Sequence, residues 1–145
     1  MFSADSPSVE GADETERLAG RFAEQLSPGD VVFLQGDVGS GKTTFVRGAC
    51  RAIGVRQPVT SPSFTLAQRY EDGRIPVSHL DFQRLGGSAE DPGLFAEEAS
   101  PGRITFVEWP SEAPPETGWR PRYVVEFEHL SPESRTIRIS DAEDS

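Results

Sequence analysis

The feature that most constrains this chain is a glycine-rich segment, Gly36-Asp37-Val38-Gly39-Ser40-Gly41-Lys42-Thr43, which fits the pattern G-x-x-x-x-G-K-[ST]. Residues 31–34 before it form an apolar run typical of a strand buried on both faces, and residues 43–53 after it have apolar side chains at helical spacing. This order predicts a loop whose backbone N–H groups converge on phosphate oxygens at the positive end of a helix. In such a loop Lys42 reaches the β- and γ-phosphates, and the Thr43 hydroxyl ligates Mg²⁺.

The composition makes an accidental match improbable. The chain has 14 basic residues, of which Lys42 alone is a lysine. With so little lysine, two glycines, a lysine and a hydroxyl residue at these offsets arise in about one in a thousand shuffled sequences. A glycine-rich turn with an incidental lysine is therefore a weak alternative.

The charge distribution also indicates an anionic ligand in the middle of the chain. The formal net charge is −10, but residues 36–85 hold seven basic and four acidic side chains. Strong direct binding to RNA or DNA is disfavoured, because such binding depends on clustered basic residues. Guanine readout through an Asn-Lys-x-Asp motif is excluded because the chain contains no asparagine, so we expect ATP.

The 145 residues predict a single domain over residues 13–140, with a disordered leader at 1–12 and an acidic tail at 141–145. Asp13 and Glu16 resemble a capping box and predict a helix over 14–26. Two hairpins are expected, one around Asp72-Gly73 and one at 123–140, with Pro76 directing its strand to an edge or a bulge. A short helix is expected near 93–99 and a buried strand at 104–107. The predicted fold class is α/β: a three-layer P-loop NTPase-like fold with a mixed central sheet and antiparallel hairpins.

Two carboxylates are candidates for completing a magnesium site, since P-loop enzymes place an acidic residue at the end of a buried strand. Glu108, directly after four apolar residues, is the first candidate, and Asp81 is the second. The hydroxyl-rich segment 60–65 fits either a switch that orders around the γ-phosphate or a set of turn caps. His79 fits a hydrogen-bonded structural role as well as a catalytic one, and Cys50 fits a small buried apolar residue.

Several further motifs occur in a fixed order along residues 15–110. They are Thr15-x-x-Leu18-Ala19, Gly29-Asp30-Val31, the loop continued by Thr44-Phe45, Thr60-Ser61-Pro62-Ser63-Phe64-Thr65-Leu66, His79-Leu80-Asp81-Phe82-x-Arg84-Leu85 and Val107-Glu108-Trp109-Pro110. In these residues the chain resembles the TsaE family, also called YjeE, the P-loop ATPases of bacterial tRNA threonylcarbamoyladenosine biosynthesis. Two positions depart from the family pattern, with Ser63 in place of a threonine and Gln83 in place of a tyrosine.

The resemblance implies ATP and Mg²⁺ as cofactors and assigns roles to single residues. Lys42, Asp81 and Glu108 would be catalytic, and Thr43, Glu108 and Asp81 would hold the metal ion. The nucleotide would be bound by Thr15, Gly36, Asp37, Val38, Gly39, Ser40, Gly41, Lys42, Thr43, Thr44 and Ser63.

The same resemblance implies TsaD and TsaB as protein partners and contact with tRNA only through them. We expect slow ATP hydrolysis by the isolated protein, no DNA or membrane partner, and a cytoplasmic location, because the lone cysteine and the absence of a long apolar run fit a reducing compartment. Two other functions use the same loop. They are a small-molecule kinase with residues 86–102 as its lid, and a non-catalytic adaptor gated by ATP.

Overall fold

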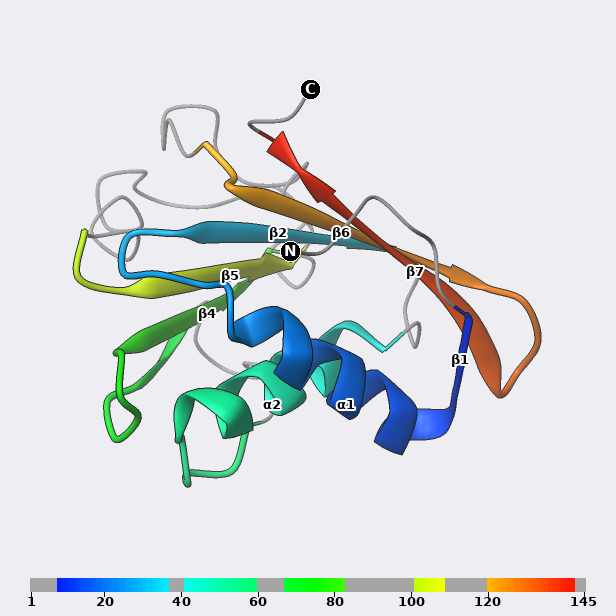
Figure 1. The fold of residues 1–145 in the computed structure, drawn as a ribbon, viewed down its shortest axis with the longest axis horizontal. Helices are drawn as coiled ribbons and strands as arrows, with labels where there is room; N and C mark the ends of the chain where they lie inside the picture. The colour runs from blue at the N-terminus through cyan, green and yellow to red at the C-terminus, as the bar shows by residue number, and fades with distance from the viewer. Residues whose placement is uncertain (1–7, 37–40, 60–66, 83–100, 109–119, 143–145) are drawn as a thin grey trace.

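A seven-stranded mixed sheet organises the residues that the computed structural model describes, which are 8–36, 41–59, 67–82, 101–108 and 120–142 (Figure 1). The strands follow the order β1-β7-β6-β2-β5-β4-β3 across the sheet. Their bounds are β1 Ser8–Glu10, β2 Val31–Gly36, β3 Ala67–Tyr70, β4 Val77–Asp81, β5 Ile104–Glu108, β6 Tyr123–His129 and β7 Ser134–Asp141. The two helices of the described part are α1 Gly11–Ala23 and α2 Lys42–Ile53.

The centre of the sheet is parallel and its two sides are antiparallel. Strand β2 pairs in parallel with β5 on one side and β6 on the other, and β4 pairs in parallel with β5. The hairpins β3–β4 and β6–β7 are antiparallel, and β1 adds to β7 at the edge. This arrangement confirms the predicted mixed sheet with antiparallel hairpins.

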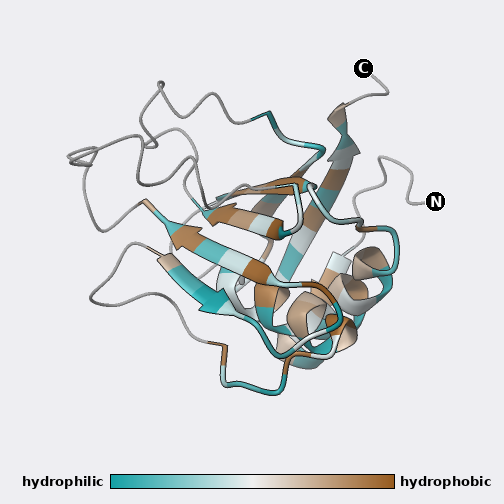
Figure 2. Ribbon diagram, turned by 90° about the vertical axis from the view of Figure 1, so that its left-hand side faces the viewer, coloured by the Kyte–Doolittle hydropathy of each residue, from teal (hydrophilic) through white to brown (hydrophobic). Residues whose placement is uncertain are grey.

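The parallel strands at the centre of the sheet are deeply buried. Every residue of β4 and β5 is buried, and hydrophobic residues fill most positions of the central strands (Figure 2). Of the two alternatives expected for Pro76, an edge or a bulge, the edge is wrong, because β4 lies between β5 and β3. Pro76 lies just before β4, so its missing N–H removes no bond from the strand, and its carbonyl accepts from the Ile104 N–H at 2.9 Å.

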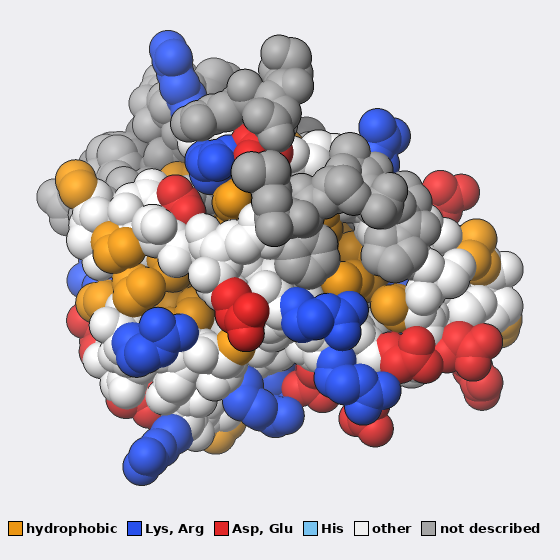
Figure 3. All heavy atoms as spheres, viewed as in Figure 1, with side chains coloured by type: hydrophobic (Ala, Val, Ile, Leu, Met, Phe, Trp, Pro, Cys, Tyr) orange, Lys and Arg blue, Asp and Glu red, His pale blue; other side chains and the backbone are white. Residues whose placement is uncertain are grey.

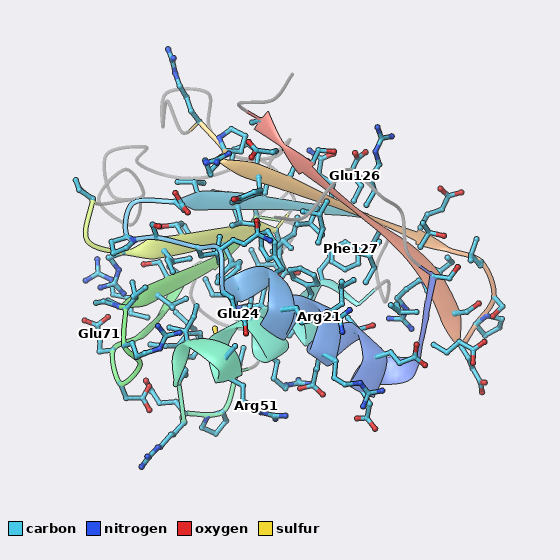
Figure 4. The ribbon with its side chains drawn as sticks, viewed as in Figure 1. Arg21, Glu24, Arg51, Glu71, Glu126 and Phe127 are labelled. Carbon is cyan, nitrogen blue, oxygen red and sulfur yellow. The ribbon has the colours of Figure 1, made fainter. Side chains whose placement is uncertain are left out.

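Both described helices cover the same face of the sheet (Figure 1). Phe45 of α2 packs against Phe22 of α1 and edge-on against Phe127 of β6, with ring centroids 5.6 Å apart in each pair. Figure 4 shows Phe127 on the helix side of β6 and its neighbour Glu126 on the other side. The expected helix near 93–99 lies outside the described residues, which contain two of the three predicted layers.

The start of α1 differs from the prediction. The helix begins at Gly11, its N-cap is Glu10, and no side chain caps it, so the capping box expected from Asp13 and Glu16 does not form. The Gly11 N–H instead donates to the Glu133 carbonyl at 3.0 Å, and β1 pairs with β7 immediately before it. Tertiary pairing therefore sets this boundary. Residues 8–12, which were expected to belong to a disordered leader, form β1 and the start of α1. The remaining leader and tail residues, 1–7 and 143–145, lie outside the described part.

Helices α1 and α2 run parallel and approach closely through glycine. A Cβ at Gly48 would lie 2.5 Å from the carbonyl oxygen and 2.6 Å from the Cα of Glu16, whereas a Cβ at Gly20 would lie 3.8 Å from Ala52. From the Glu16–Gly48 contact to the Gly20–Ala52 contact the residue number rises by four in each helix, so the two helices run in the same direction. The first turns of the two helices consequently lie at the same end of the sheet.

The outer face of the helices is charged. Basic and acidic side chains are mixed over it (Figure 3), and Arg51 of α2 pairs with Glu16 of α1 at 3.5 Å. None of the described helices has the length and apolar character needed to cross a membrane.

Candidate nucleotide and metal site

The glycine-rich segment connects the carboxyl end of β2 to the start of α2. Its described ends, Gly36 and Gly41, both have positive φ angles, 150° and 105°, and Gly41 in the left-handed region is the N-cap of α2. Residues that carry a side chain rarely adopt such backbone angles, which explains why glycine stands at both ends. Asp37, Val38, Gly39 and Ser40 lie outside the described residues.

Lys42 closes this segment. Its ammonium Nζ donates to the Gly36 carbonyl at 2.6 Å, and the residue is 5% exposed. A buried ammonium is costly without acceptors, and here it is held against the loop's own backbone. Phosphate oxygens are stronger acceptors than a carbonyl for the same donor because they are charged, so the geometry suits an anion bound at the loop.

The start of α2 offers no competing negative charge within the helix. The first turn contains no acidic residue, and the N-cap makes no side-chain hydrogen bond. The helix N-terminus thus keeps backbone N–H groups and its positive dipole end for a ligand.

Thr43, Glu108 and His79 form a connected group at the carboxyl ends of the central strands. The Thr43 hydroxyl donates to Glu108 Oε2 at 3.3 Å, and His79 Nε2 bonds to the same oxygen. Glu108 is 3% exposed and His79 is fully buried. When Glu108 is ionised its oxygens only accept, so His79 Nε2 is then the donor, and this buried contact holds the carboxylate in one orientation.

Asp81 stands beside Glu108. The two residues are directly paired in register across β4 and β5, and Asp81 is 4% exposed. Parallel strands are about 4.8 Å apart, and both side chains project from the face that the helices cover, since Val77 and Phe106 of the same alternation belong to the helix-side core. A cation between or beside two carboxyl groups this close would interact favourably with both.

These groups fit Mg²⁺. The ion prefers oxygen ligands and is usually held by one or two carboxylates together with substrate phosphates, and Thr43, Glu108 and Asp81 supply such oxygens. No group of three His, Cys, Asp or Glu side chains in the described ranges could hold a metal ion by itself. Phosphate oxygens of a bound nucleotide would supply the further ligands that Mg²⁺ takes.

The structure brings most of the described predicted residues to one end of the sheet, with Thr15 farther back in α1. Thr44 is half-buried in the first turn of α2. Thr15 is buried and its hydroxyl donates to the Gly11 carbonyl at 3.1 Å, so it contacts its own helix. Ser63, the segment 60–65, Gln83 and Trp109 lie outside the described residues.

One residue near the site, Arg135, was not identified from the sequence, and the role of another, His79, was left open. The structure joins His79 to Glu108. Arg135, from β7, lies against Gly41. No motif surrounds Arg135, and only its position in the β6–β7 hairpin could have indicated it.

Neighbouring ionisable groups support the strands and helix of the site. Arg103 donates to Ser78 Oγ at 2.8 Å and to the Val77 carbonyl at 2.9 Å, and its hydrogen bond to Glu71 lowers the pKa of that carboxyl group.

Cys50 in α2 is buried, as expected. Its burial, and to a smaller extent repulsion from Asp72, raises the pKa of the thiol to about 12.

A family model and individual relatives both point to the same protein family. The family model "Threonylcarbamoyl adenosine biosynthesis protein TsaE" matches residues 9–138. Proteins named tRNA threonylcarbamoyladenosine biosynthesis protein TsaE are 41% identical over 98 residues in Bacillus subtilis and 38% identical over 105 residues in Synechocystis. These matches cover 67% and 69% of this chain.

The matched region spans 61% of the Bacillus subtilis relative and 66% of the Synechocystis relative. A crystal structure of YdiB from Bacillus subtilis is similar over 98% of this chain and 91% of its own, with a TM-score of 0.67 and 25% identity. The similarity in fold thus extends beyond the region of clear sequence identity.

Proposed function

The chain belongs to the TsaE family, and from this premise we propose that it binds and slowly hydrolyses ATP in the threonylcarbamoyladenosine modification of tRNA. The relatives' names place them in that biosynthesis. One observation in this chain carries the proposal: Lys42 is buried at the mouth of the glycine-rich loop, while Thr43 at the next position is bonded to the buried carboxylate of Glu108.

Binding would begin with an exchange of partners at Lys42. Its ammonium would leave the Gly36 carbonyl for the β- and γ-phosphates, and the N-terminal N–H groups of α2 would face the same oxygens. Because Lys42 already lies in a fixed buried position, little side-chain ordering remains for the binding step.

Thr43, Glu108 and Asp81 would hold Mg²⁺, which would supply a Lewis acid at the phosphate oxygens and neutralise the charge that develops there. His79 keeps the Glu108 carboxylate oriented by donating from Nε2. Either Asp81 or Glu108 would orient the water that attacks the γ-phosphate in line with the leaving oxygen. Bond formation from water to phosphorus and loss of ADP then give inorganic phosphate.

We propose that hydrolysis by the isolated protein is slow. Fast P-loop enzymes commonly use an arginine at the γ-phosphate to stabilise the transition state. In the described part of the chain, the side chains bonded to Glu108 are those of Thr43 and His79, and neither is an arginine. Partners would supply the missing stabilisation or use the nucleotide state as a signal.

TsaD and TsaB are the proposed partners, in the cytoplasm, and contact with tRNA would be left to them. The net charge of −10 supports that division, because phosphate polymers repel an acidic surface. No DNA or membrane partner is proposed.

Reconstitution with TsaD and TsaB tests this function. We expect threonylcarbamoyladenosine formation over many turnovers to require this protein and ATP, and the Glu108→Gln variant to bind nucleotide without supporting it. If Glu108→Gln supports modification fully, the protein acts as an ATP-gated adaptor. If label from the γ-phosphate of ATP enters an organic acceptor instead of free phosphate, the protein is a kinase.

A further inference from the structure

Arg135 lies directly against the last residue of the glycine-rich loop. A Cβ built on Gly41 would be 3.4 Å from Cδ and 3.5 Å from Cζ of Arg135, and closer still to its Nη1. Gly41 leaves room for the guanidinium by having no side chain. The arginine comes from a strand that is 94 positions later in the chain, so the sheet brings the two together.

The register of the sheet places Arg135 beyond the carboxyl end of β2. Gly36, the end of β2, pairs with Phe127, and β6 continues two residues further to His129, which pairs with Arg135. Ile137 and Ile139 of the same alternation are buried in the helix-side core, so Arg135 projects on the face that carries α2. Ligands of open α/β sheets bind in this region, at the carboxyl ends of the parallel strands.

The electrostatics of this position favour an anion. Arg135 stands beside the N-terminus of α2, which has a positive dipole end, no acidic first-turn residue and Lys42 as its first residue. Two cationic side chains at the positive end of one helix repel each other, and a bound anion attracts both and offsets that repulsion. Arginine can also offer two parallel N–H groups to a phosphate.

The side from which Arg135 approaches identifies the part of the nucleotide that it meets. Glu108 and Asp81 lie on β5 and β4, on one side of β2, whereas Arg135 reaches the loop from β7, beyond β6 on the other side. In the proposed function the carboxylates would hold the metal ion, and the terminal phosphate would lie on their side. We infer that Arg135 is a further nucleotide-binding residue that contacts the inner phosphates, opposite the metal side, an inference that rests on the proposed function.

The test is calorimetric binding of ADP in EDTA and of a slowly hydrolysed ATP analogue with Mg²⁺. We expect Arg135→Gln to weaken both ligands by a similar factor, about tenfold or more, because one charge-assisted contact is lost. Arg135→Lys should lie between wild type and Arg135→Gln. Arg138→Gln is the matched control, since Arg138 is exposed on the opposite face of the same strand and should stay within about twofold of wild type.

The outcomes separate the inference from its premise. Binding by Arg135→Gln and Arg135→Lys within twofold of wild type would overturn the inference while leaving ATP binding intact. Weakening of the ATP analogue alone would also overturn it, because Arg135 would then contact the terminal phosphate. Failure of the folded wild-type protein to bind either ligand would remove the proposed function itself. Thermal unfolding of each variant shows that it is folded, and the Lys variant decides the matter if the Gln variant is not.

Discussion

The close crossing of α1 and α2 gives a prediction in which the same substitution has opposite effects at two positions. Gly48→Ala would place a methyl group 2.5 Å from the Glu16 carbonyl oxygen and 2.6 Å from its Cα, both backbone atoms that cannot rotate away. Gly20→Ala would place its methyl 3.8 Å from Ala52 Cβ and from the Gly48 carbonyl oxygen, which is ordinary contact.

The magnitudes follow from two opposing terms. Alanine in place of a helical glycine stabilises by about 0.5–1 kcal/mol. Overpacking destabilises by about 1–3 kcal/mol, and at Gly48 the helices must separate by roughly 0.8 Å to reach a normal carbon–oxygen distance of about 3.3 Å. We therefore expect Gly48→Ala to lower the free energy of unfolding by about 1–2 kcal/mol and Gly20→Ala to raise it by about 0.5–1 kcal/mol.

Urea denaturation at equilibrium measures both values, with thermal midpoints shifting by about 2–4 °C per kcal/mol in a chain of this size. The two variants are each other's control, because they share the substitution and the helix pair. An equal gain in stability for both variants would refute the reasoning, since it would mean that the helices are not in backbone contact at Gly48.

Three further predictions concern the site and the helix behind it. Glu108→Gln should abolish the strengthening of ATP binding by Mg²⁺ while leaving ADP affinity in EDTA unchanged, and a Mg²⁺ titration that still strengthens binding as in wild type would contradict the metal assignment. His79→Ala should lower the hydrolysis rate at saturating ATP by about 10- to 100-fold with little change in metal-free ADP affinity, as expected for loss of a group that orients a metal ligand; equal loss of both would indicate a general structural role. Cys50 should react with a disulfide reagent at pH 8 only when the protein unfolds, because a pKa of about 12 instead of 9.0 reduces its thiolate population by about a thousandfold; rapid labelling of the folded protein would show that the thiol is accessible.

The parts of the fold that depend on local chemistry could be predicted. Helix α2 was expected at 43–53 and is found at Lys42–Ile53, ending at Gly54 in the left-handed conformation. Its signals are the glycine-rich loop before it, its apolar spacing and the glycine after it, all within 20 residues. The β6–β7 hairpin was expected for the same reason, from alternation around a short turn.

The parts that depend on distant pairing could not be predicted in this way. The start of α1 is set by β1 on β7 and by the Gly11 bond to Glu133, and neither leaves a trace in the local sequence. The position of Pro76 depends on which strand pairs with β4. At the site, Thr43 and Glu108 are 65 positions apart, and the sequence placed them together only as expected ligands of one magnesium ion, without predicting the bond between them.

The central claim is tested most directly by calorimetry, which measures the binding of ATP with Mg²⁺ to the wild-type protein and to the Lys42→Met variant. Methionine keeps the buried side chain's shape and removes its charge, so the folded structure should survive. Wild type should bind, and the variant should bind at least about tenfold to a hundredfold more weakly, because charged hydrogen bonds to phosphate are lost. Equal affinities, or no binding by folded wild-type protein, would contradict the account.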